Sequence, residues 1–235
     1  MFDGVLNFLK PSGMTSNDAV GFVKRTLRQA GTPAEKVGHG GTLDPEAAGV
    51  LPILLGKATR LFDEISDKRK IYIGEIVFGE STDTQDAFGK VIGASAHIPQ
   101  KQELLDILGR FTGEIKQVPP KYSALKINGV AAYELARRGK EFETCERDAR
   151  VYGIDWLAQT ADNIHVLRVE CGRGTYIRTL FHDMGAALGT ASHMGFLLRA
   201  SCGEYIISRS RTMREVSEAA AGRVFRDLIY TVYYG

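Results

Sequence analysis

The sequence predicts an α+β fold on a largely antiparallel sheet. Segments with strand character and segments with helix character are mixed along the 235 residues. Several neighbouring strand segments are joined by connections too short for the crossover that parallel pairing needs. The hydrophobic fraction of 44% and the charged fraction of 25% are those of an ordinary globular chain. The length fits one large domain, or a core domain with one small addition.

Strands are expected where β-branched and aromatic residues gather or where a short apolar run ends at turn residues. In chain order they are residues 4–9, 70–79, 114–118, 123–127, 151–158, 163–171 and 204–207. The first ends in KPSG at residues 10–13, and the fourth ends in Asn128-Gly129, both of which are turn signatures. The segments 151–158 and 163–171 are expected to form a hairpin.

Helices are expected where apolar residues recur at helical spacing beside capping residues. In chain order they are residues 16–30, 57–66, 100–109, 131–138 and 175–188. Ser16 or Asn17 is the expected N-cap of the first helix, and Gly139 is the expected C-cap of the fourth. The glycine-rich segment 36–49 and the polar segment 80–89 are expected to be irregular.

Cysteine content, hydropathy and charge narrow the class of protein. The three cysteines, Cys145, Cys171 and Cys202, lie far apart and form no CxxC pair, so neither a disulfide scaffold nor a zinc site is expected. The sequence has no run of about 18 apolar residues that would predict a membrane span. Asp3 stands where a secretory signal would be basic. The net charge of +2 permits RNA binding without requiring it.

Glycine-rich segments raise the possibility of nucleotide binding, which their spacing does not support. Residues 49–58 have the wrong glycine spacing for a P-loop, and Ala58 stands where Ser or Thr would hold magnesium. Residues 38–41 do not make the dinucleotide fingerprint. The sequence contains neither a GxSxG nucleophile elbow nor an HExxH metal motif. ATPase, dehydrogenase, esterase and metalloenzyme activities are therefore not predicted.

Residues 37–61 place an aspartate in a setting that suits a catalytic carboxylate. Asp44 follows a glycine-rich stretch that permits close approach of a ligand, precedes an apolar run, and has His39 nearby. A carboxylate in a partly apolar pocket needs a cationic partner to stay ionised. Arg178, at the start of the expected helix 175–188, is the candidate. Alternatively, Asp44 caps the turn that follows it, and Arg178 contacts phosphate or forms a surface ion pair.

Three motifs resemble the signature motifs of bacterial TruB-type tRNA pseudouridine-55 synthases. They are KPSGMTS at residues 10–16, GGTLDPEAAGVLP at residues 40–52 and GTYIR at residues 174–178. Further similarity lies in TDTQD at 82–86, YSALK at 122–126 and AYELAR at 132–137. The resemblance follows the order of the family over about residues 4–205, which is far more than one short motif provides.

The resemblance implies a pseudouridine-synthase-like fold, with a central, largely antiparallel mixed sheet flanked by helices. It implies isomerisation of a specific uridine to pseudouridine in tRNA, expected at position 55 in the TΨC loop. Asp44 matches the catalytic aspartate, which attacks either the sugar C1′ or the base after the nucleotide is flipped out. No metal or cofactor is implied, because the reaction needs no redox change and no external nucleophile.

Five further residues match substrate-binding positions of the family: His39, Tyr72, Tyr176, Arg178 and Leu197. Tyr72 matches the tyrosine that stacks on the flipped base, Arg178 the partner of the aspartate, and Leu197 the leucine beneath the uracil. His39 and Tyr176 match residues that contact or support the flipped nucleotide. Without the resemblance, Tyr72 would be interpreted as a half-buried strand aromatic and Leu197 as a core residue.

The resemblance also implies how the chain is divided. Residues 1–207 are expected to form the catalytic domain, with an RNA-gripping insertion at about 119–148, where Lys126 and Arg137 are candidates for contacts with the RNA backbone. Residues 208–235 are expected to form a C-terminal tail without a complete PUA domain. The expected partner is the T-arm of tRNA. The chain is expected to act in the cytoplasm as a monomer, with no membrane and no obligatory protein partner.

Two departures and two alternatives accompany this prediction. The family usually has Ala-His where this chain has Ser192-His193, and an arginine where it has Leu198. The lost cation is expected to weaken RNA binding and to leave the pocket intact. The alternatives are an RNA-binding or tRNA-folding protein, and an isomerase that acts on another RNA such as ribosomal RNA. The intact Asp44, Tyr72 and Arg178 set argues against lost chemistry.

Overall fold

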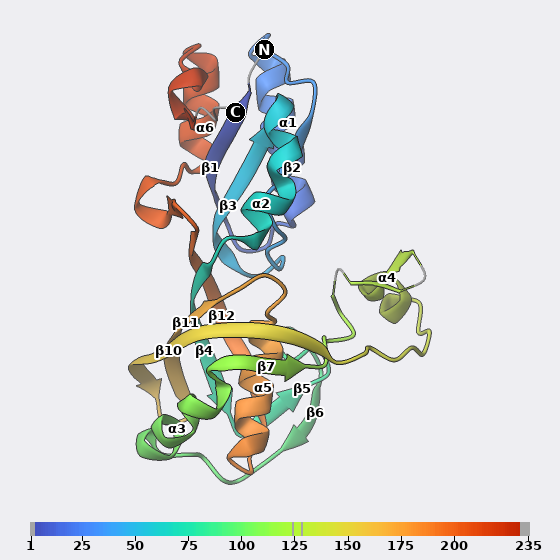
Figure 1. Ribbon diagram of the computed structural model, residues 1–235, viewed down its shortest axis with the longest axis vertical. Helices are drawn as coiled ribbons and strands as arrows, with labels where there is room; N and C mark the ends of the chain where they lie inside the picture. Colours follow the sequence, from blue (N-terminus) through green and yellow to red (C-terminus); the bar gives the residue numbers. More distant parts are fainter. Residues whose placement is uncertain (1–2, 124, 128, 231–235) are drawn as a thin grey trace. The chain divides into compact units, whose positions relative to one another are not determined.

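The computed structural model describes residues 3–123, 125–127 and 129–230 (Figure 1). The chain divides into two compact units, residues 1–72 with 198–235 and residues 73–197. It enters the second unit within strand β4 (Lys70–Phe78) and leaves it within strand β12 (Ser192–Cys202). Strands and helices are mixed, and most strand pairs are antiparallel. The predicted α+β class with a largely antiparallel mixed sheet is therefore confirmed.

Strands β1 (Gly4–Lys10) and β3 (Ala48–Leu55) form the centre of the sheet in the first unit. They pair antiparallel along their length, from Gly4 opposite Leu55 to Lys10 opposite Gly49. Both strands are buried along almost their whole length, as expected for strands covered on both faces. The other strands of this unit are β2 (Val37–His39) beside β3, the end of β12 parallel to β3, β13 (Tyr205–Ile206) beside β12, and β14 (Ile229–Tyr230) beside β1.

Helix α1 spans Ser16–Gln29, so its N-cap is the residue before Ser16 and not Ser16 or Asn17 as predicted. Thr15 is the N-cap: its hydroxyl accepts the Asp18 N–H at 3.0 Å, and the Asp18 carboxylate accepts the Thr15 N–H at 3.1 Å. The predicted cap at Ser16 or Asn17 is wrong because the Ser16 hydroxyl is buried and bonds elsewhere. The other helical segments of this unit are η1 (Gly56–Leu61), α2 (Phe62–Asp67), η3 (Ile207–Arg209), α6 (Met213–Ala221) and η4 (Phe225–Leu228).

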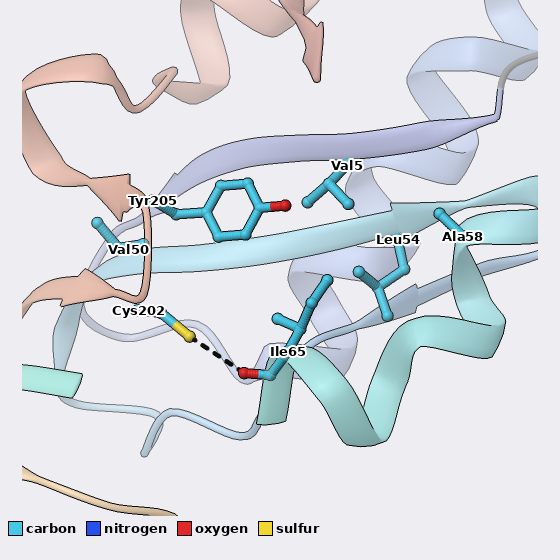
Figure 2. Packing of buried hydrophobic residues seen from close by; sticks show 7 residues of the cluster. All are labelled: Val5, Val50, Leu54, Ala58, Ile65, Cys202 and Tyr205. Atoms are coloured by element: carbon cyan, nitrogen blue, oxygen red, sulfur yellow. Dashed lines mark hydrogen bonds between the residues drawn. The ribbon is translucent and has the colours of Figure 1, made fainter. Parts of the chain in front are cut away.

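A cluster of buried side chains packs the sheet of the first unit against α2 (Figure 2). Its members are Val5, Val50, Leu54, Ala58, Ile65, Cys202 and Tyr205. The Cys202 thiol donates to the backbone carbonyl of Ile65 at 3.6 Å, which ties β12 to α2. The Tyr205 ring meets the ring of Tyr230 edge to face, with centroids 5.5 Å apart. The end of the described chain thus reaches this core.

Residues 208–230, expected as a tail, fold onto the first unit. Helix α6 buries Val216 and Ala220, and η4 buries Phe225. Strand β14 pairs with β1 through Val5 opposite Tyr230 and Leu6 opposite Ile229. The segment therefore contributes both core side chains and an edge strand.

In the second unit the strand order is β12, β4, β11, β10, β7. The predicted hairpin is confirmed as β10 (Arg147–Ala161) and β11 (Ile164–Cys171). The remaining elements are β5 (Glu80–Thr82) paired with β6 (Val91–Ala94), α3 (Lys101–Ile107) continued by η2 (Leu108–Phe111), β7 (Gly113–Gln117) and α5 (Ile177–Ala187). Among the described residues, no helix has both the length and the apolar character needed to cross a membrane.

The chain between β7 and β10 carries the small elements of the predicted insertion (Figure 1). They are β8 (Lys126–Ile127), β9 (Val130–Ala131) and α4 (Ala132–Arg137). Gly139 follows α4 with a φ of 66°, the left-handed conformation expected of the predicted C-cap glycine. Asn128 of the predicted turn lies outside the described residues.

Strands β2, β3, β5, β6, β9, β12 and β14 were not predicted, and β2 and β5 lie in the segments 36–49 and 80–89, which were expected to be irregular. Strand β3 is buried on both faces, so its apolar run shows no alternation with period two. Strand β12 contains buried polar residues, Ser192, His193 and Arg199, which look like surface residues in the sequence alone. Tertiary partners decide the burial of those side chains, and a local pattern cannot contain that information.

Candidate active site

Asp44 lies in the loop between β2 and β3, and we call residues 40–47 the aspartate loop. Two of its apolar side chains, Leu43 and Ala47, are buried, whereas Asp44 is partly exposed. The Ala47 N–H donates to the Asp44 carbonyl at 3.2 Å, so Asp44 begins a tight turn. The loop thus anchors its flanks and leaves the carboxylate accessible.

The Ser16 hydroxyl holds the aspartate loop on the N-terminal side of Asp44. It donates to the Leu43 carbonyl at 3.0 Å and accepts the Leu43 N–H at 2.9 Å. Both groups are buried, so neither can exchange this partner for water. One serine therefore satisfies both backbone groups of the residue before Asp44.

The Lys10 ammonium holds the loop on the C-terminal side of Asp44. Lys10 is fully buried, and its Nζ donates to the carbonyls of Pro11, Met14 and Pro45 at 2.9, 2.5 and 2.9 Å. Burial lowers the pKa of Lys10 to about 8, and the charges of Glu46 and Asp44 act in the opposite direction. Lys10 thus places a positive charge beside the aspartate loop.

Two further groups of the same N-terminal motif reach the loop. The Ser12 hydroxyl donates to the Glu46 carbonyl at 2.7 Å, and the Gly13 N–H donates to the Pro45 carbonyl at 3.0 Å. The motif at residues 10–16 therefore serves as a support for the motif at residues 40–52. This support explains physically why the two motifs occur together.

Arg199 holds the aspartate loop from strand β12. Its side chain is buried, with an exposed fraction of 1%. Nε donates to the Val50 carbonyl at 2.7 Å, and the two Nη groups donate to the Thr42 and Gly41 carbonyls at 3.2 Å each. No role was predicted for Arg199 from the sequence, where the comparison with the family at residues 197–199 concerned only Leu197 and the arginine replaced by Leu198.

His39 and Tyr72 complete the predicted residues of the first unit. His39 ends β2, and its Nδ1 accepts the Gly41 N–H at 3.4 Å. Burial lowers the pKa of His39, and the charge of Arg199 lowers it further, so the neutral imidazole is favoured. Tyr72 is buried in β4, with an exposed fraction of 9%.

Among the predicted site residues in the second unit, Arg178 is the charged one. Its buried guanidinium, in the first turn of α5, donates to the Thr84 carbonyl at 3.1 Å and to the Tyr122 carbonyl at 3.0 Å. It also forms an ion pair with Asp86 at 3.7 Å. Asp86 lies in the TDTQD motif that carries part of the family resemblance, but no role was predicted for it from the sequence.

Tyr176 and Leu197 are also held by neighbours within the second unit. Tyr176 is the N-cap residue of α5; its N–H donates to the Gln117 side chain at 3.0 Å, and the Gln117 amide donates back to its carbonyl at 3.1 Å. Leu197 is buried beside Gly74, where an added Cβ would lie 3.0 Å from the Leu197 Cδ1. Gly74 thus leaves room for the leucine.

The structure places the predicted site residues in two groups. His39, Asp44 and Tyr72 belong to the first unit, and Tyr176, Arg178 and Leu197 belong to the second. For the RNA-backbone candidates, Lys126 belongs to β8 and Arg137 to α4, and their side chains lie outside the described part of the structure.

Comparison with known proteins identifies the family. Residues 25–177 match the TruB family pseudouridylate synthase (N terminal domain). The chain is 42% identical over 221 residues to tRNA pseudouridine synthase B of Caldanaerobacter subterraneus subsp. tengcongensis, covering 93% of this chain and 75% of the relative. It is 40% identical over 242 residues to tRNA pseudouridine synthase B of Streptococcus mutans serotype c, covering 99% and 80%.

Solved structures share the fold. A chain in the crystal structure of a Cbf5-Nop10-Gar1 complex superposes with a TM-score of 0.75 at 30% identity, covering 97% of this chain and 59% of that one. A chain in an H/ACA RNP bound to a substrate RNA containing 2′-deoxyuridine gives 0.71 at 27%, covering 96% and 58%. The match to the family model and the shared fold define a pseudouridylate synthase. The chain belongs to the TruB family.

Proposed function

We propose that this chain isomerises a uridine of tRNA to pseudouridine, at position 55 of the TΨC loop, with Asp44 as the nucleophile. The observation that carries the proposal is the aspartate loop, whose backbone is held on both sides of Asp44 by Ser16, Lys10 and Arg199. Membership of the TruB family supports the reaction class. The relatives' name, tRNA pseudouridine synthase B, supports tRNA as the substrate.

The proposed reaction leaves the atomic composition of the nucleotide unchanged. The Asp44 carboxylate attacks either the sugar C1′ or the base, and the bond between C1′ and N1 breaks. The uracil turns, a bond forms between C1′ and C5, C5 releases its proton, and N1 takes up a proton. The carboxylate is regenerated, so the step consumes no oxidant and no second substrate. A loop fixed before the substrate arrives places the carboxylate without reorganisation during the reaction.

We assign the remaining predicted residues as follows. Arg178 is the cationic partner of Asp44, and its own hydrogen bonds to the Thr84 and Tyr122 carbonyls orient its guanidinium. Tyr72 stacks on the flipped base, and Leu197 lies beneath the uracil. His39 and Tyr176 support the flipped nucleotide, and the partly buried His39, whose neutral form is favoured, suits contact with a polar but uncharged group.

The insertion is proposed to grip the RNA. Lys126 and Arg137 would contact the T-arm backbone, and residues 121–140 carry five basic side chains against a single acid, Glu134. We further propose that residues 1–207 carry the catalytic machinery, and that the chain acts in the cytoplasm as a monomer. Sedimentation of the purified chain with and without tRNA tests the monomer.

Release of tritium from C5-labelled uridine in an unmodified tRNA transcript tests the proposed function. The parent chain is expected to release tritium, and Asp44→Asn is expected to lose at least about three orders of magnitude in rate. Glu35→Gln, which removes an exposed carboxylate of the same unit, is the matched control and should keep the parental rate. Locating the product by sequencing chemistry specific for pseudouridine then tests position 55.

Three other results would count against the proposal. Release that persists in Asp44→Asn would remove Asp44 from its role. Binding of tRNA without release, by both chains, would favour an RNA-binding or tRNA-folding protein. Release from a ribosomal RNA fragment but not from tRNA would keep the reaction and change the substrate.

A further inference from the structure

Arg199 is a buried cation whose hydrogen bonds all go to backbone carbonyls on the two flanks of Asp44. Gly41 and Thr42 precede the aspartate, and Val50 follows it in β3. One planar guanidinium therefore connects the entry and the exit of the loop that carries Asp44. In the part of the chain that the structure describes, Arg199 forms these three hydrogen bonds and no ion pair with a carboxylate.

The chain brings Arg199 to this place through a close backbone contact. Strand β12 runs parallel to β3, with Arg199 opposite Gly49. A Cβ at Gly49 would lie 2.3 Å from the Arg199 carbonyl oxygen and 2.7 Å from its nitrogen, and Gly49 has a φ of 121°. Glycine is thus required for the approach that lets the guanidinium reach the loop.

Burying a charged side chain is unfavourable unless its hydrogen bonds are satisfied. A neutral donor could also bond to backbone carbonyls, so the presence of an arginine here needs a further reason. A guanidinium offers a rigid, planar fork of donors, whereas an ammonium is a compact point charge on a flexible stem. The fork can bond at fixed positions to the adjacent carbonyls of Gly41 and Thr42 and to the carbonyl of Val50, which come from two stretches of chain. The geometry therefore uses the shape of arginine as well as its charge.

We propose that Arg199 is a positioning residue for Asp44, which fixes the aspartate loop so that the carboxylate is held ready for attack. This inference rests on the proposed role of Asp44 as nucleophile. Arg199 acts through the loop backbone and does not itself touch the reacting atoms. The charge of Arg199 also lowers the pKa of His39 and of Lys10.

Two variants of the full chain separate shape from charge. Arg199→Lys keeps the charge and loses the fork, and Arg199→Met keeps the buried aliphatic stem and removes the charge, so it is the variant best able to fold. Val216→Ala, which truncates a buried side chain of α6, is the control for lost stability alone. The readouts are the single-turnover tritium release rate at saturating tRNA, the Kd for tRNA, and amide hydrogen exchange over residues 40–50.

Both Arg199 variants are expected to release tritium about 100-fold more slowly, with Kd within about twofold of the parent, because displacement of a reacting group by about 1 Å has an effect of that size. Amide hydrogen exchange over residues 40–50 should be faster in both Arg199 variants than in the parent chain. Val216→Ala should keep the parental rate at temperatures where it is folded. Proton resonances of His39 should titrate at higher pH in Arg199→Met, since a nearby positive charge has been removed.

A parental rate in Arg199→Lys, or unchanged exchange over residues 40–50 in both variants, would overturn the inference. An equal loss of rate in Val216→Ala would also overturn it, because the effect would then follow stability. If the parent chain itself released no tritium, the proposed function would fail, and the exchange measurement alone would decide whether Arg199 holds the loop.

Discussion

Single buried polar side chains organise this protein by bonding to backbone groups. Ser16, Lys10 and Arg199 each satisfy carbonyls or N–H groups of the aspartate loop. Such groups are rarely left unpaired in a protein interior, so each side chain both stabilises and orients the loop. The second unit repeats the principle with Arg178 and the Thr84 and Tyr122 carbonyls.

The protonation of the buried His165 side chain makes the stability of the fold depend on pH. Its Nδ1 accepts the indole N–H of Trp156 at 3.1 Å, and its Nε2 is buried without a hydrogen-bond partner among the described residues. Burial lowers the pKa of His165 below its usual 6.5. The unfolded chain therefore binds more protons than the folded one near this pH, so the stabilisation is present above 6.5 and is lost as the pH falls.

We expect the free energy of unfolding to decrease below pH 6.5, and less steeply in His165→Gln. Trp156 is the single tryptophan of the chain, so its fluorescence reports on this hydrogen bond. The emission of the folded parent should change as acid protonates His165, and that of His165→Gln should stay constant. Identical urea unfolding profiles of both chains from pH 5 to 8 would show that His165 does not contribute.

Among the secondary-structure elements, the start of α1 combines a helix cap and a support for the aspartate loop in two neighbouring residues. Thr15 closes the capping box of the helix, and Ser16 bonds to Leu43 in the aspartate loop. Thr15→Ala is expected to reduce the free energy of unfolding by about 1 kcal/mol, the usual effect of losing an N-cap. It should leave the rate of pseudouridine formation unchanged once the chain is folded.

Ser16→Ala is expected to behave differently. It leaves the buried N–H and carbonyl of Leu43 without their partner, which reduces the free energy of unfolding by about 1–3 kcal/mol. Because Leu43 directly precedes Asp44, the single-turnover rate should fall as well. Urea unfolding and single-turnover tritium release are measured on both variants. Equal rates of tritium release in Thr15→Ala and Ser16→Ala would contradict the assignment of capping to Thr15 and loop support to Ser16.

At the scale of the whole molecule, the two ends of the chain build one unit. Residues 3–72 supply β1, α1 and β3, and residues 198–230 supply the end of β12, α6 and β14. Strand β14 of the C-terminal segment pairs with β1. Phe225 of the same segment is buried, with an exposed fraction of 1%. A change near the C-terminus should therefore destabilise the unit that carries Asp44.

Phe225→Ala tests that expectation. Removing a buried phenylalanine side chain is expected to reduce the free energy of unfolding by about 3–5 kcal/mol. The adjacent Val224, which is 51% exposed, provides the matched control, and Val224→Ala should stay within about 0.5 kcal/mol of the parent. Thermal and urea unfolding of both variants make the comparison, and equal stability of the two would show that the segment packs loosely.

Much of the fold and part of the site can be predicted from local sequence. The β10–β11 hairpin, the helices α1, α3 and α5, and strand β4 follow from periodicity and turn residues. Strand β3 escapes prediction because burial on both faces removes its alternation. Strands β5, β6 and β14 are too short for a period to be recognised.

The α+β class, the TruB resemblance and the expectation that Asp44 is catalytic follow from the amino-acid sequence alone, because they depend on composition, local periodicity and the order of short motifs. The way in which the aspartate loop is held becomes visible in the folded chain. Lys10 precedes Asp44 by more than thirty residues and Arg199 follows it by more than a hundred and fifty. Nothing in either local sequence marks a buried cation, since burial and hydrogen-bond partners arise only when β1, β3 and β12 pair in one sheet.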